Sequence, residues 1–138
     1  MKFLKVLPHV LLLSATALSA GQTKRAETAK VEDGILVKQG KEVKVKGEDL
    51  QLTFVSVMDD SRCPEGATCV WAGNGRVHLI ARNSKGDCAE FDLNTTLEPL
   101  EHDFGRYQIK LVQLSPYPSI KHTSKPDEYV ATLVVTKK

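Results

Sequence analysis

Aromatic residues are scarce in this sequence: they make up 6% of its 138 positions, and tryptophan occurs once. The core must therefore consist mainly of Val, Leu and Ile. No ten consecutive residues hold a clean 3.6-residue apolar period, which argues against a fold built from amphipathic helices. The chain also lacks internal repeats and low-complexity blocks, and its length suits one domain with a modest core.

A net charge that would attract nucleic acid is missing as well. The chain carries 19 basic and 17 acidic residues, but the N-terminal segment described next contains Lys2 and Lys5 and no acidic residue. Removing that segment leaves 17 residues of each sign. No basic stripe with interleaved aromatic residues is present either, so we expect no nucleic-acid partner.

The first 21 residues have the features of an export signal. Lys2 and Lys5 precede the apolar stretch 6–18, and small residues at 15–21 offer cleavage after residue 17, 19 or 21. The apolar stretch is shorter than the roughly 20 residues that a spanning helix needs. An N-terminal membrane anchor is therefore the weaker alternative, and we expect no membrane span once the signal is removed.

The end of this signal resembles a bacterial lipoprotein cleavage box, but Gln22 stands where that box requires a cysteine. No thiol is available there for lipid attachment. We therefore expect a soluble exported protein, located in the periplasm or the medium. The expected organisation is a signal peptide at 1–21, a flexible tail at 22–30 and a single all-β domain at 31–138.

The remainder of the chain shows short segments of β-type patterning separated by turn signals. Alternating or β-branched residues predict strands in seven segments: Gly34–Lys38, Glu42–Lys46, Leu50–Met58, Arg76–Arg82, Cys88–Leu93, Tyr107–Leu114 and Tyr129–Thr136. Val43 and Val45 are expected to face the core. The segment 50–58 is expected to be buried on both faces, while 95–105 is less regular and 115–126 is a loop with three prolines. About seven short strands indicate an all-β fold, an antiparallel β-sandwich or barrel.

The segment 59–73 is the densest in special residues, because it holds two of the three cysteines and the only tryptophan. Export to an oxidising compartment favours a disulfide between Cys63 and Cys69, a bond that stabilises by about 2–3 kcal/mol in the chain-entropy estimate. Gly66 allows a tight turn inside the ring. Cys88 is the odd cysteine: we favour a free or buried thiol over an intermolecular bridge or an exchange with one partner of the pair.

A metal site is the weaker interpretation of these residues. The spacing of Cys63 and Cys69 differs from that of a zinc knuckle, and no second cysteine pair exists. His78, His102 or Cys88 would complete a site only by coincidence of folding. A calcium role for neighbouring carboxylates matches no known loop spacing. We therefore expect no metal and no cofactor.

The residues around the cysteines form the candidate binding loop. Trp71 is interpreted as a packing residue that covers the disulfide or closes one end of the sandwich, rather than as a platform for a ligand. The charged residues at the loop entrance predict a local Asp–Arg pair, and Asn74-Gly75 is a hairpin-turn signal. The candidate binding residues are Asp59, Asp60, Arg62, Glu65, Thr68, Trp71 and Asn74.

The run from Asp60 to Gly73 follows the pattern DSRCP-x4-C-x-WAG. This pattern resembles a group of small bacterial secreted proteins and lipoproteins with an all-β domain. The resemblance implies export, a disulfide and an all-β fold, and it implies no activity. The chain departs from the group in lacking a lipid-attachment cysteine and in having Cys88.

The sequence favours a binding protein over an enzyme. Its three histidines outside the signal, His78, His102 and His122, accompany no nucleophile motif. We expect a non-enzymatic exported domain that binds a protein or envelope ligand through its disulfide-stapled loop, since loops on a rigid sandwich carry such contacts. The alternatives are a secreted protease inhibitor and a carrier of a metal or small ligand.

Overall fold

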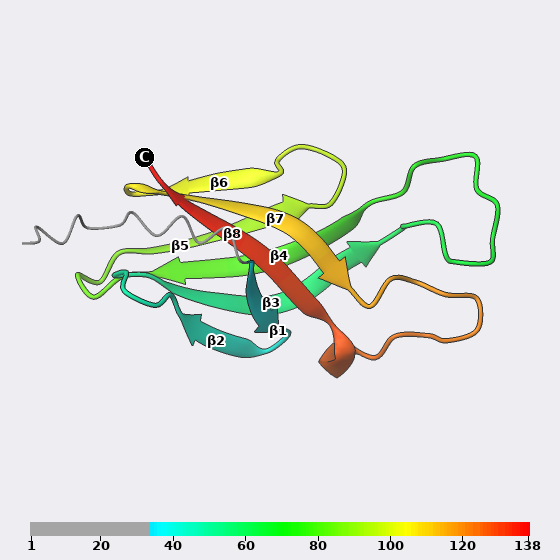
Figure 1. Cartoon of the computed structure of the whole chain (residues 1–138), viewed down its shortest axis with the longest axis horizontal. Helices are drawn as coiled ribbons and strands as arrows, with labels where there is room; N and C mark the ends of the chain where they lie inside the picture. The colour runs from blue at the N-terminus through cyan, green and yellow to red at the C-terminus, as the bar shows by residue number, and fades with distance from the viewer. Residues whose placement is uncertain (1–33) are drawn as a thin grey trace, which may run out of the picture.

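The computed structural model describes residues 34–138 as two antiparallel sheets of four strands each, packed face to face (Figure 1). The predicted signal peptide and tail, and residues 31–33 of the expected domain, lie outside the described residues. The strands are β1 (Ile35–Lys38), β2 (Lys41–Lys44), β3 (Gln51–Asp60), β4 (Gly75–Arg82), β5 (Cys88–Asn94), β6 (Glu101–Phe104), β7 (Tyr107–Ser115) and β8 (Val130–Lys137), and a short 3-10 helix η1 (Pro126–Glu128) precedes β8. One sheet has the order β1-β8-β7-β6 and the other the order β2-β3-β4-β5, so the predicted sandwich is confirmed and no single barrel closes.

The core lies between the sheets and follows the period-two alternation of the strands. In β4, Val77, Leu79 and Ala81 are fully buried while the intervening side chains are not. Val45 is buried and Val43 packs against the core from its edge, as the alternation predicts. Burying each large apolar side chain contributes about 1.5–3 kcal/mol, which makes this layer the main source of stability.

β3 differs from the prediction that it is buried on both faces. Its register against β4 shifts after Phe54 and again after Val57, so the strand contains two bulges. A bulge reverses the alternation locally. Phe54 and Val57 therefore both turn towards the core, while Val55 is exposed.

β6 is an eighth strand, in the segment 95–105 that was expected to be irregular. It pairs only with residues 107–110 of β7. Within residues 34–138, the end of β7 at 112–115 consequently has a strand neighbour, β8, on one side alone. This uncovered stretch of β7 is important for the site described below.

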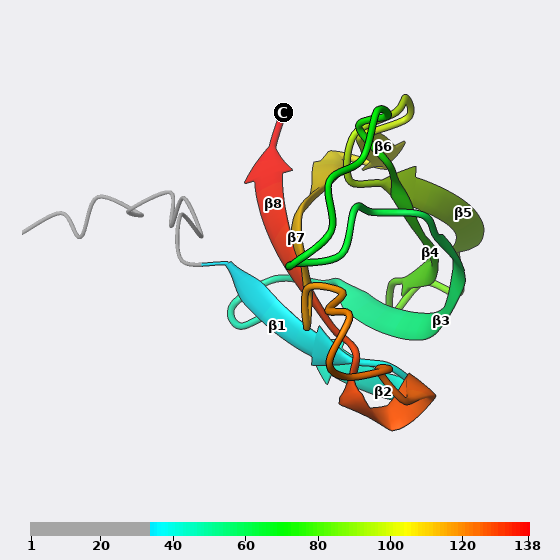
Figure 2. The ribbon, with the colours of Figure 1, turned by 90° about the vertical axis from the view of Figure 1, so that its right-hand side faces the viewer.

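Antiparallel connectivity divides most of the connections between the two ends of the sandwich. The connections 61–74, 95–100 and 116–129 lie at one end, here called the loop end, and Figure 2 looks onto it. The turns 45–50, 83–87 and 105–106 lie at the other, the turn end. Among residues 34–138 there is no helix of the length and apolar character that a membrane crossing requires.

Candidate functional site

The loop end contains the predicted disulfide. Cys63 and Cys69 are bonded, with their Cα atoms 5.9 Å apart, which confirms the pairing. Gly66 turns the chain inside the ring with a φ of +89°, and the Ile120 side chain lies directly over it. The disulfide therefore closes a compact ring that rests against the 116–129 connection.

Backbone hydrogen bonds join this ring to the 116–129 connection. The Glu65 amide donates to the Pro118 carbonyl at 2.8 Å, and the Ile120 amide donates to the Glu65 carbonyl at 3.2 Å. These bonds form a one-residue parallel bridge between Glu65 and Ser119. Two connections that are far apart in the sequence thus behave as one unit, and both can be followed at the right-hand side of Figure 1.

Arg62 is the main internal tie of this unit. Its side chain is only 6% exposed, and its Nε and Nη2 atoms each donate to the Asp60 carboxylate at 2.8 Å. Nη1 donates to the Leu114 carbonyl at 2.6 Å and Nη2 to the Pro116 carbonyl at 3.0 Å. The predicted Asp–Arg pair is therefore confirmed. The same guanidinium also supplies donors to the end of β7 that β6 leaves uncovered.

The charge of Asp60 is held in place by its surroundings. Burial alone would raise the pKa of Asp60, but the hydrogen bonds and the positive charge of Arg62 outweigh it, so that the pKa lies below its ordinary value. The Tyr129 hydroxyl donates a further hydrogen bond at 3.1 Å. Burial, followed by the charge of Asp60, raises the pKa of Tyr129. These hydrogen bonds link the end of β3 to the connections 61–74 and 116–129.

Asn74 joins the disulfide loop to the third connection. Its buried side chain donates to Asn94 Oδ1 at 2.8 Å, and its own Oδ1 accepts the Thr96 amide at 3.1 Å. The predicted hairpin turn at Asn74-Gly75 is therefore wrong, because Gly75 begins β4 and the connection before it spans residues 61–74. Asn74 positions the loops from inside rather than facing a partner.

Trp71 lies mostly in solvent, so it packs less than the sequence suggested. Its indole Nε1 donates to the Ser61 carbonyl at 3.3 Å, and this bond leaves most of the ring in solvent. Four apolar side chains on the two joined loops are exposed by half or more: Val70 (97%), Trp71 (61%), Tyr117 (50%) and Ile120 (62%). We call these four residues the loop-end patch.

A groove of about 240 Å³ lies beside the patch. The Tyr117 side chain and the exposed bulge residue Val112 of β7 border it, together with the backbone of Ala72 and Gly73. Arg62 forms part of its wall and lies 5.1 Å from the centre of the Tyr117 ring, a cation–π distance. The patch and groove present apolar and aromatic surface on a rigid support.

The other predicted loop residues are spread over the same end. Glu65 and Thr68 are exposed on the disulfide ring, and Asp59 is exposed on β3 opposite Arg76 of β4. The candidate loop thus divides into internal ties, Arg62 and Asn74, and surface residues. No local pattern pointed to Tyr117 and Ile120, because their connection carries only a loop pattern.

His78, His102 and the third cysteine lie outside this unit, whereas His122 lies in the 116–129 connection with its Nε2 3.0 Å from Glu128 Oε2. His78 Nδ1 lies 2.6 Å from Asp92 Oδ1 on the outer face of its sheet, and the His102 ring stacks on Phe91 with centroids 4.0 Å apart. Cys88 is free, as favoured, and exposed near the turn end. In the part of the chain from 34 to 138, no three His, Cys, Asp or Glu side chains are grouped so that they could hold a metal ion. No protein-family model, no curated protein and no solved structure matches this chain.

Proposed function

We propose that this protein is a non-catalytic exported domain that binds a protein partner through the loop-end patch. The observation that carries the proposal is the exposure of Trp71, Tyr117 and two aliphatic side chains on loops that are covalently and internally fixed. Aromatic side chains in such settings provide much of the binding energy in protein interfaces.

The rigidity of the loops supports binding because ordering a flexible loop costs free energy on association. Here the disulfide, the Glu65–Ser119 bridge and the Arg62 donors already restrict the loops in the free protein. The partner that suits the patch is a protein with an exposed apolar segment, since Val70 and Ile120 offer no charge or hydrogen-bonding group to a polar ligand.

Site-specific photo-crosslinking in the native cells tests the proposal. A photoreactive residue replaces Val70 in one variant and Ile120 in a second, and both residues are exposed by more than half. The matched control replaces Leu36 of β1, which is 65% exposed but lies on a sheet face away from the loops. We expect the same protein to be captured from both patch positions and not from the control.

Two results would contradict the proposal. One is equal capture from Leu36 and from the patch positions, and the other is the absence of any protein adduct at Val70 and Ile120. If the captured protein is a peptidase that the purified domain inhibits, the partner is an enzyme and the domain is the secreted inhibitor considered above. A captured protein with no peptidase activity leaves the broader binding function.

A further inference from the structure

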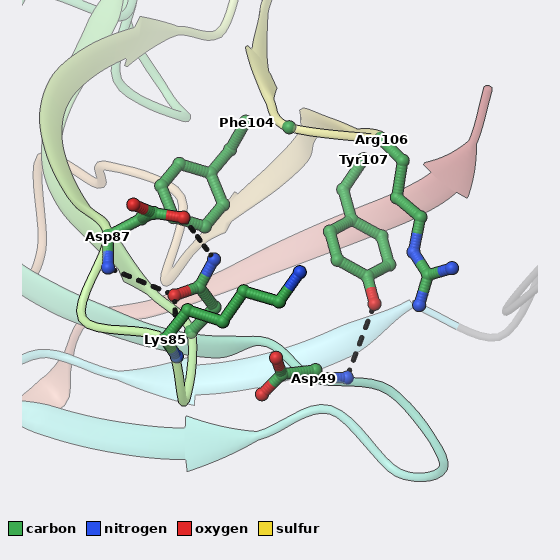
Figure 3. A pocket seen from close by; sticks show the side chains of 8 residues that line it. Asp49, Lys85, Asp87, Phe104, Arg106 and Tyr107 are labelled. Carbon is green, nitrogen blue, oxygen red and sulfur yellow. Dashed lines mark hydrogen bonds between the residues drawn. The ribbon is translucent and has the colours of Figure 1, made fainter.

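A second cavity lies at the turn end, far from the loop-end patch. The turns 45–50, 83–87 and 105–106 surround a space of about 480 Å³ (Figure 3). Its lining includes two cations, Lys85 and Arg106, and two aromatic rings, Phe104 and Tyr107. The volume lies within the range of small-molecule sites, about 300–1,000 Å³.

The carboxylates of this cavity are already occupied by hydrogen bonds within the turns. Both oxygens of Asp49 accept bonds of 2.9 Å from Ser84, one from its amide and one from its hydroxyl. These bonds, the backbone one first, lower the pKa of Asp49. Asp87 accepts a bond of 2.8 Å from the Asn83 side-chain amide. The acidic groups therefore serve to shape the turns.

The two cations are not committed in the same way. Within residues 34–138, neither Lys85 nor Arg106 forms an ion pair, although seven other pairs involve Arg, Lys or His side chains at the surface. An ammonium group has three donors and a guanidinium five, and neither has an acceptor. Both cations can therefore donate to a ligand with an anionic group.

The aromatic residues provide a fixed apolar floor. The Tyr107 hydroxyl donates to Glu48 at 3.0 Å and accepts the Asp49 amide at 3.2 Å, so its ring cannot turn away. The Arg106 guanidinium lies 5.5 Å from the centre of that ring. Figure 3 shows the Lys85 side chain reaching across the cavity towards Tyr107, with Phe104 on the opposite side.

We propose that the turn-end cavity binds a small organic anion, a carboxylate with an aromatic or apolar body. The carboxylate lies between the Lys85 ammonium and the Arg106 guanidinium, and the body of the ligand rests against Phe104 and Tyr107. This site is independent of the loop-end patch, because it lies on the opposite turns and uses none of the same residues.

Amide-detected NMR titrations with three probes test the proposal. Phenylacetate carries both features, phenethylamine carries the ring with the opposite charge, and acetate carries the anion alone. We expect phenylacetate to shift the amide signals of Lys85, Gly105 and Arg106 in a saturable way. Acetate should bind more weakly at the same amides, and phenethylamine should leave them unshifted.

Two charge variants and one control complete the test. Lys85→Met and Arg106→Met should each weaken phenylacetate binding about fivefold, the upper range for a solvent-exposed ion pair. Lys121→Met, an exposed lysine of the loop end, should leave the affinity unchanged. The proposal is overturned if phenethylamine binds as well as phenylacetate, if no probe shifts these amides, or if both charge variants, with native spectra, bind like the parent.

Discussion

Replacing Arg62 by Met removes the main tie of the loop end while keeping an apolar side chain of similar length. The variant leaves the Asp60 carboxylate without its cation and the Leu114 and Pro116 carbonyls without their donors. Removing one partner of a buried pair typically costs about 3–5 kcal/mol. Lost bonds to neighbouring carbonyls do not add independently, so we expect a total loss within that range.

Such a loss is a large part of the stability of a domain of this size, which is about 5–15 kcal/mol. It corresponds to a fall in Tm of roughly 12 °C or more. Urea and thermal unfolding followed by far-UV circular dichroism give the global change, and Trp71 fluorescence reports on the loop end itself. Arg82→Met is the matched control, because Arg82 is half exposed and reaches Glu42 only at 4.0 Å; its effect should stay below about 0.5 kcal/mol.

A loss of less than about 1 kcal/mol in Arg62→Met would refute the role assigned to Arg62. Such a result would mean that the Asp60 pair and the two carbonyl bonds contribute no more than an ordinary surface contact. The disulfide and the Glu65–Ser119 bridge would then have to hold the loop end alone.

Three further outcomes follow from the same geometry. Because the folded pKa of Asp60 lies below the ordinary value of 3.8, its pair with Arg62 stabilises fully above that pH and is lost as pH falls through the folded value. In urea titrations at acid pH, the stability difference between the parent and Arg62→Met should therefore shrink. A difference that stays constant with pH would contradict this role of the Asp60 charge. Gly73→Ala should lower the free energy of unfolding in urea by about 2 kcal/mol or more, because φ is +70° and a Cβ would overlap the Arg62 backbone. Gly86→Ala is the control: its φ is +92° but the space around it is open, so the loss should be only about 1–2 kcal/mol. Equal losses for the two variants would argue against the close contact at Gly73. A thiol assay should find one reactive group per chain before reduction, Cys88, and unreactive native protein would contradict its exposure.

The parts of the fold that local patterning controls could be predicted from the sequence. Period-two alternation placed Val77 and Leu79 inward, and the two cysteines of a chain expected to be exported indicated their bond. β6 was missed because Phe104 is its only large apolar residue. The bulges of β3 were missed because no residue type marks them, and they return Val57 to the core.

The candidate site was predictable in its position but not in its internal arrangement. The pair of Asp60 with Arg62 is local, so neighbouring residues indicate it. The bonds of Arg62 to Leu114 of β7 and to Pro116 span more than 50 residues and depend on the short length of β6, which no local pattern encodes. Trp71 was assigned to packing on residue type alone, whereas its bond to Ser61 holds it at the surface.

The affinity of the captured partner for Trp71→Ala tests the binding role of the loop-end patch most directly. Isothermal titration with the purified partner compares this variant with Leu36→Ala, whose side chain is exposed to a similar degree. Truncation of an aromatic hot-spot residue costs about 2 kcal/mol or more, so we predict binding that is weaker by roughly 30-fold for Trp71→Ala and unchanged for Leu36→Ala. Equal affinities for the two variants would contradict a binding surface at the loop end.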